Sequence, residues 1–274
     1  MRQGQRWVVW GVGILVGLGI LGVEGGSAGE GGYADDTVPP TVFQAAGPTI
    51  EAIQGTVDQF RAALGEPNNA NAPGPLASGR REINWDGGGS TETAVAGTPF
   101  DGFLVNRGAL FITPGSGFVQ APLAGLVETF DNPTYDAIFQ TFSPLRLFTP
   151  IGSPITEVYF FMPGGGNIPA TTTGFGAIFT DVDQPDGRPP DYGERRASTW
   201  IQYFDSHGQL LFSSAVPASP GDGRLSFFGL VFDEARIARV QITSGDAAPG
   251  PDDEAPHDIV VMDDFFYGEP QPLP

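Results

Sequence analysis

The sequence predicts an all-β protein, an antiparallel and jelly-roll-like β-sandwich that carries one amphipathic helix near its N-terminus. Two observations favour this fold class. Short runs rich in Phe, Val and Ile recur from Arg80 onward without a helical pattern between them, which is typical of stacked antiparallel sheets. The chain also holds 40 Gly and 26 Pro among 274 residues, and beside so many apolar residues these predict turns between strands.

The clearest expected strands lie in the second half of the chain. They cover residues 155–162, 174–180, 199–204, 209–213, 225–232, 237–244 and 259–267. Asp205 to Gly208 predicts a tight hairpin turn, because Gly208 can adopt a positive φ. Several runs are apolar at successive positions, so we expect them to be central strands of a two-layer fold.

One helix is expected within residues 48–66. Its apolar residues recur at the spacing of a single helical face. These residues are Ile50, Ile53, Val57, Phe60 and Leu64. Thr49 is placed to cap the start of the helix and Gly65 to end it. We expect the apolar stripe to pack on the sandwich.

The N-terminal segment has the features of an export signal. Arg2 and Arg6 precede the uncharged apolar run 7–23, and residues 26–28 (Gly-Ser-Ala) offer a cleavage site after Ala28. We therefore expect a signal peptide over residues 1–28 and a periplasmic or extracellular protein. An uncleaved membrane anchor is the alternative, since the apolar run is close to the length of a membrane span.

The remaining segments differ in composition. Residues 29–47, rich in Gly, Pro and acidic residues, are expected to form a flexible leader. Residues 67–81 are expected to be a linker after the helix, 82–268 the sandwich domain, and 269–274 a tail.

Composition excludes several classes of function. The net charge of −19 repels phosphates, which excludes nucleic acids and anionic membrane surfaces as partners. The chain has no Cys, and therefore no disulfide, thiolate nucleophile or cysteine metal site. All 13 basic residues are Arg, which removes lysine chemistry, and His207 and His257 are the only histidines.

Three aromatic residues in expected loops are candidate ligand-binding residues. Trp85 precedes a Gly-rich stretch, and Tyr135 and Tyr192 lie in two other expected loops. A flat ring can stack on the apolar face of a sugar. We therefore expect Trp85, Tyr135 and Tyr192 to bind a glycan where the fold gathers them into one exposed groove.

Short motifs between residues 174 and 268 combine apolar runs with Gly or Asp. They are Gly174-Phe175-Gly176-Ala177, Phe204-Asp205, Phe227-Phe228-Gly229, Ile237-Ala238-Arg239-Val240, Met262-Asp263-Asp264-Phe265 and Tyr267-Gly268. In these residues the chain resembles a loose group of secreted bacterial jelly-roll proteins. Its general shape is similar to galactose-binding-like and carbohydrate-binding modules. The resemblance implies glycan binding and a structural calcium ion.

Two groups of aspartates are candidate calcium ligands, because calcium prefers hard oxygen ligands. Asp181 and Asp183 lie in an acidic loop. Asp263 and Asp264 lie inside an apolar run, where alternation would point them to opposite faces and a buried carboxylate needs a partner. The resemblance implies that Asp86 lies opposite this pair. Capping of these carboxylates by backbone N–H groups or Arg is the alternative.

Taken together, these features predict a secreted, non-catalytic β-sandwich that binds a glycan or another cell-surface component. Two alternatives stay open. One is a carboxylate-based hydrolase of extracellular polysaccharide, although acidic residues are too numerous for the sequence to single out an acid–base pair. The other is a structural matrix protein.

Overall fold

The computed structural model describes residues 38–87, 89–184, 198–251 and 257–273. The expected signal peptide and the first part of the expected leader lie outside these residues. None of the helices in the described ranges is long and apolar enough to cross a membrane.

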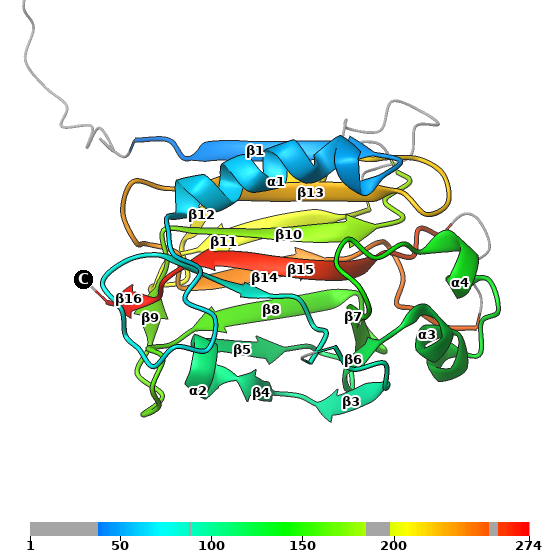
Figure 1. Cartoon of the computed structure of the whole chain (residues 1–274), viewed down its shortest axis with the longest axis horizontal. Helices are drawn as coiled ribbons and strands as arrows, with labels where there is room; N and C mark the ends of the chain where they lie inside the picture. The colour runs from blue at the N-terminus through cyan, green and yellow to red at the C-terminus, as the bar shows by residue number, and fades with distance from the viewer. Residues whose placement is uncertain (1–37, 88, 185–197, 252–256, 274) are drawn as a thin grey trace, which may run out of the picture. The chain divides into compact units, whose positions relative to one another are not determined.

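Two large antiparallel sheets form the molecule (Figure 1). Across the eight-stranded sheet the strand order is β1 (Thr41–Gly47), β13 (Leu225–Val231), β10 (Gly174–Thr180), β15 (Val261–Gly268), β7 (Leu147–Ile151), β6 (Gly117–Ala121) and β3 (Ala94–Gly97), and β2 (Arg80–Ile83) also pairs with β15. Across the six-stranded sheet the order is β12 (Leu210–Ala215), β11 (Trp200–Phe204), β14 (Arg239–Thr243), β8 (Ile155–Phe160), β5 (Ala109–Ile112) and β4 (Phe100–Phe103). These sheets confirm the predicted β-sandwich, and its jelly-roll arrangement stays a prediction.

The main core lies between the two sheets and is rich in aromatic rings. Trp85 is at its centre, stacked on Phe148 with ring centroids 3.7 Å apart and meeting Phe111 and Phe265 edge to face. Such ring pairs add to the stabilisation that comes from burying their apolar area. The 21 Phe residues of the chain are thus largely explained by this layer and the two smaller clusters outside it.

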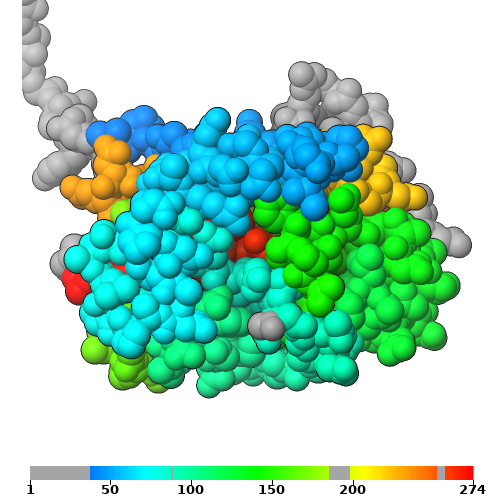
Figure 2. Space-filling model, viewed as in Figure 1, coloured from blue at the N-terminus to red at the C-terminus, as the bar shows by residue number. Residues whose placement is uncertain are grey.

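Helix α1 (Ile50–Leu64) covers part of the outer face of the eight-stranded sheet (Figure 1 and Figure 2). Its buried residues are Ile53, Val57, Phe60 and Leu64, four of the five in the predicted stripe. The ring of Phe60 lies over Gly176 and Gly229, which are paired across β10 and β13. A Cβ atom at Gly176 would come within 2.7 Å of this ring, so glycine is required there for the helix to approach the sheet.

The short helices α3 (Leu123–Phe130) and α4 (Tyr135–Ile138) cover another part of the same face. They bury Leu126 and Tyr135 against apolar residues of β6, β7 and β15, among them Val119 and Val261. A further helix, α2 (Leu104–Arg107), follows β4. The sequence pattern did not predict these three helices, since each spans eight residues or fewer.

Three segments that were expected outside the sandwich belong to it. Residues 41–47 of the expected flexible leader form β1, which pairs with β13 from Thr41↔Val231 to Gly47↔Leu225. The expected linker 67–81 ends in β2, and its Arg81 is fully buried. In the expected tail 269–274, Glu269 is buried and Gln271–Pro272 form β16, paired with β9 (Ala170–Thr171).

One buried ion pair explains why the linker and the tail are ordered. Arg81 donates two hydrogen bonds of 2.7 Å to the carboxylate of Glu269. Its third nitrogen donates to the carbonyl oxygens of Ala70, Ala72 and Asn106. A buried guanidinium needs all of these acceptors, and Ala70, Ala72 and Glu269 come from the two segments that were expected to be a linker and a tail.

Candidate functional site

The outer face of the six-stranded sheet is partly exposed along its central strands. Residues of β8, β11 and β14 alternate between buried and partly exposed positions. The register brings the partly exposed side chains into three rows across the strands. The rows are Phe204, Arg239 and Tyr159; then Gln202, Gln241 and Glu157; then Trp200, Thr243 and Ile155. We call these nine residues the open face.

Glu157 is the centre of a hydrogen-bond network on the open face. Its carboxylate accepts hydrogen bonds from the Tyr159 hydroxyl at 2.7 Å, from Arg239 Nη1 at 2.6 Å and from Gln241 Nε2 at 3.0 Å. The Arg239 guanidinium also lies over the ring of Phe204, 3.8 Å from its centroid. Burial and the hydrogen bond to Glu157 raise the pKa of Tyr159 above its usual value. The network therefore fixes the orientation of these side chains before any ligand arrives.

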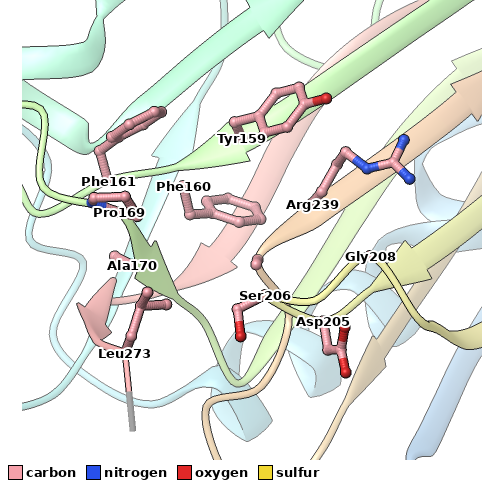
Figure 3. A pocket seen from close by; sticks show the side chains of 11 residues that line it. Tyr159, Phe160, Phe161, Pro169, Ala170, Asp205, Ser206, Gly208, Arg239 and Leu273 are labelled. Atoms are coloured by element: carbon pink, nitrogen blue, oxygen red, sulfur yellow. The ribbon is translucent and has the colours of Figure 1, made fainter.

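A pocket of about 370 Å³ adjoins the open face, beyond the row of Phe204, Arg239 and Tyr159 (Figure 3). It is lined by Tyr159, Phe160, Phe161, Pro169, Ala170, Asp205, Ser206, Gly208, Ala238, Arg239 and Leu273. Tyr159 and Arg239 thus belong to both the pocket and the open face. Asp205 and Ser206 come from the β11–β12 turn, where Asp205 accepts hydrogen bonds from the N–H groups of His207 and Gln209.

The aromatic residues expected to bind a ligand are placed elsewhere. Trp85 is 1% exposed, and its indole N–H donates to the carbonyl oxygen of Asp263. Tyr135 is fully buried in α4, and its hydroxyl donates to the carbonyl oxygen of Gly250. Both rings pack in apolar clusters, so neither forms the expected exposed groove. Tyr192 lies outside the described residues.

The structure gathers three of the five candidate calcium ligands around residues 142–146. Asp86 accepts hydrogen bonds from the N–H groups of Leu145 and Arg146, and Asp263 from those of Phe142 and Ser143. The hydroxyl of Ser143 donates to Asp264 at 2.6 Å. This is the capping by backbone N–H groups that the sequence left as the alternative, with a hydroxyl added.

The expectation that Asp263 and Asp264 point to opposite faces is wrong. The register between β10 and β15 shifts here, so that Ile178 alone stands opposite both aspartates. This β-bulge interrupts the alternation of the strand and brings both carboxyl groups to one side. Asp181 is buried, and Asp183 accepts a hydrogen bond from the N–H of Gly221. Across the described ranges, no three His, Asp or Glu side chains form a group that could hold a metal ion.

Asp263 and Asp264 interact directly, and both are almost fully buried. Burial, followed by the charge of Asp264, raises the pKa of Asp263 well above its usual value. Burial also raises the pKa of Asp264 to about 6. Asp263 Oδ1 accepts no N–H or O–H from another described residue. A proton on this oxygen, shared with Asp264, gives it a partner and removes one of two adjacent negative charges.

Comparison with family models, with curated proteins and with solved structures found no match for this chain. The open face was not predicted, although its signal is present in the sequence. Polar residues alternate with apolar ones in Arg239–Thr243, as on a sheet with one wet face, and Gln202 stands between two buried positions in Trp200–Phe204.

Proposed function

We propose that the protein is a secreted, non-catalytic binding module that holds a neutral glycan chain on the open face. The observation that carries this proposal is the combination of aromatic rings with a fixed hydrogen-bond network on one partly exposed sheet face, next to a pocket. Sugars offer the same combination, since their C–H faces stack on rings and their hydroxyl groups pair with polar side chains.

The polar groups of the open face suit hydroxyl ligands. Arg239, Gln202 and Gln241 carry more N–H donors than Glu157 can accept, so the network retains donors for a ligand. Glu157 and the two amide oxygens supply acceptors. Because the chain carries a net charge of −19, a neutral glycan fits better than an acidic one.

The proposal includes export, which is supported by the apolar segment 7–23 between Arg6 and the small residues 26–28. Mass spectrometry of protein recovered outside the cytoplasm should show a chain that begins at Gly29. A full-length chain found only in the membrane fraction would instead show that this segment is an anchor.

The two other candidate functions have less support among the residues that the structure describes. A carboxylate hydrolase needs an acid–base pair that a polysaccharide can reach. The adjacent carboxyl groups of Asp263 and Asp264 are 0% and 3% exposed, and both are bonded to residues 142–143. A matrix protein would be recognised by self-assembly.

Binding to an array of neutral, acidic and amino-sugar polysaccharides tests the proposal. We expect binding to neutral polysaccharide without release of product, weakened about tenfold or more by Tyr159→Ala or Trp200→Ala, because rings at the centre of an interface carry much of its affinity. Val105→Ala, at an exposed position of α2, is the matched control and should bind normally. Product release would indicate a hydrolase, and assembly without glycan binding would indicate a matrix protein.

A further inference from the structure

The pocket lies in line with the open face along the strand direction. Successive rows of the open face run from Ile155 to Tyr159 along β8, and the pocket is lined by the next residues, Phe160 and Phe161. Four residues of extended strand separate the first row from the third, about 13 Å at roughly 3.3 Å per residue. A linear ligand lying parallel to β8 would therefore enter the pocket at one end.

The small sheet of β9 and β16 forms the wall at that end. Pro272 pairs with Ala170, and Phe161 forms a bridge with Pro169. These pairings hold Leu273 and Pro169 at the pocket (Figure 3). Leu273 is 41% exposed and stands at the rim. The wall consists of paired backbone and apolar side chains, so a chain on the open face meets an obstacle there.

The two sides of the pocket differ in chemistry. Figure 3 shows Phe161, Pro169 and Leu273 on one side, and Ser206, Asp205 and Arg239 on the other. A sugar ring has the same two aspects, an apolar C–H face and a rim of hydroxyl groups. A volume of about 370 Å³ is near the lower end for small-molecule sites, which suits a single terminal unit better than a folded chain.

We propose that this pocket binds the terminal sugar residue of the glycan, and that the rest of the chain lies along the open face toward Trp200. The protein thus recognises one end of a neutral glycan chain rather than its interior. This inference rests on the proposed function, and it adds the part of the glycan that is recognised.

End-blocked oligosaccharides test the proposal directly. The probes are neutral oligosaccharides of the type selected by the array, each prepared with both ends free, with a bulky group on the non-reducing end, or with the same group on the reducing end. We expect a block at one end to weaken binding at least tenfold and a block at the other end to change it less than twofold. Equal binding of both blocked forms would overturn end recognition.

A variant that fills the pocket gives a second test. Ser206 is exposed in the β11–β12 turn, so Ser206→Trp adds a large side chain at the pocket without entering the core. It should weaken binding of the free oligosaccharide at least tenfold, whereas Val95→Trp, at an exposed position of β3 on the other sheet, should not. If free oligosaccharides bind and Ser206→Trp has no effect, end recognition fails while glycan binding stands. If no oligosaccharide or polysaccharide binds, the proposed function itself fails.

Discussion

The outer faces of the two sheets differ in what covers them. On the eight-stranded sheet, β10 and β15 are buried at every position, because α1, α3 and α4 pack on the face that points away from the main core. On the six-stranded sheet, β8, β11 and β14 alternate between buried and partly exposed residues. The eight-stranded sheet is therefore the middle of three layers along β10 and β15, whereas the outer face of the six-stranded sheet stays partly exposed to solvent.

This difference separates stability from recognition. The outer face of the eight-stranded sheet, which we call the covered face, carries glycines and apolar side chains that fit the packing of the helices on it. Gly176 and Gly229, which lie beneath Phe60, are examples. The open face carries Tyr159, Arg239 and Glu157, whose polar groups are bonded to one another yet remain partly exposed. Substitutions on the covered face should therefore lower the free energy of unfolding, whereas substitutions on the open face should mainly weaken ligand binding.

The largest expected effect is that of Phe60→Ala on the covered face. Phe60 is fully buried against Phe43, Phe227 and Phe266, so its loss should lower the free energy of unfolding by about 3–5 kcal/mol. Urea denaturation monitored by circular dichroism measures this change. Phe204→Ala is the matched variant on the open face and should cost only about 1 kcal/mol, mainly through its contact with Arg239. Equal losses in the two variants would contradict the comparison.

The dependence of the free energy of unfolding on pH probes the buried carboxyl groups of Asp263 and Asp264, which lie on the covered face. The pKa of Asp264 is raised to about 6 and that of Asp263 well above its usual value, so the folded state holds protons that the unfolded state has released above about pH 4. Their contribution to stability is complete below about pH 4 and is lost as the pH rises through the raised pKa values, about 6 for Asp264. Within this range the free energy of unfolding should fall by up to about 1.4 kcal/mol per pH unit for each such proton.

The groups around the pair do not reverse this sign. Arg61 Nη2 lies 3.9 Å from Asp264 but also bonds to Glu82, while its Nη1 bonds to Asp58, so one positive charge is shared by three carboxylates. Asp263→Asn should flatten the loss of stability above about pH 4, since an amide cannot ionise. Asp101→Asn, at an exposed position of β4, should leave the slope unchanged. An unaltered slope in Asp263→Asn would show that the pair does not hold the proton.

Much of the fold was predictable because strand periodicity is local. The runs 174–180 and 225–232 are apolar at nearly every position, and they became the doubly covered strands β10 and β13. The residues of strand β1 were placed in a flexible leader because the segment 29–47 is rich in Gly, Pro and acidic residues, and the pairing of β1 with β13 is a contact between distant parts of the chain. Tertiary pairing of this kind leaves no periodic signal in the strand itself.

The candidate site was less predictable, for reasons visible in particular residues. Trp85 and Tyr135 stand next to turn-forming residues, but only the fold shows that their rings point into apolar clusters. The bulge at Asp263 and Asp264 depends on the register with Ile178, which the sequence of one strand does not determine. The rows of the open face likewise require the register of three strands, although the alternation within each strand was already present.

The smallest expected effect on stability is that of Glu157→Gln at the centre of the open face. The side chains of Glu157 and Arg239 are 20% and 21% exposed, so solvent screens their attraction and its loss should cost less than about 1 kcal/mol. Glycan binding should nevertheless weaken several-fold, because Tyr159 and Arg239 lose the carboxylate that fixes their orientation. Urea denaturation and calorimetric titration with neutral oligosaccharide measure the two effects on the same protein. Glu128→Gln, at an exposed position of α3, controls for the change of charge and should alter neither. A loss of stability above about 2 kcal/mol with unchanged binding would mean that the Glu157 network belongs to the structural core, and the open face would then have no separate role.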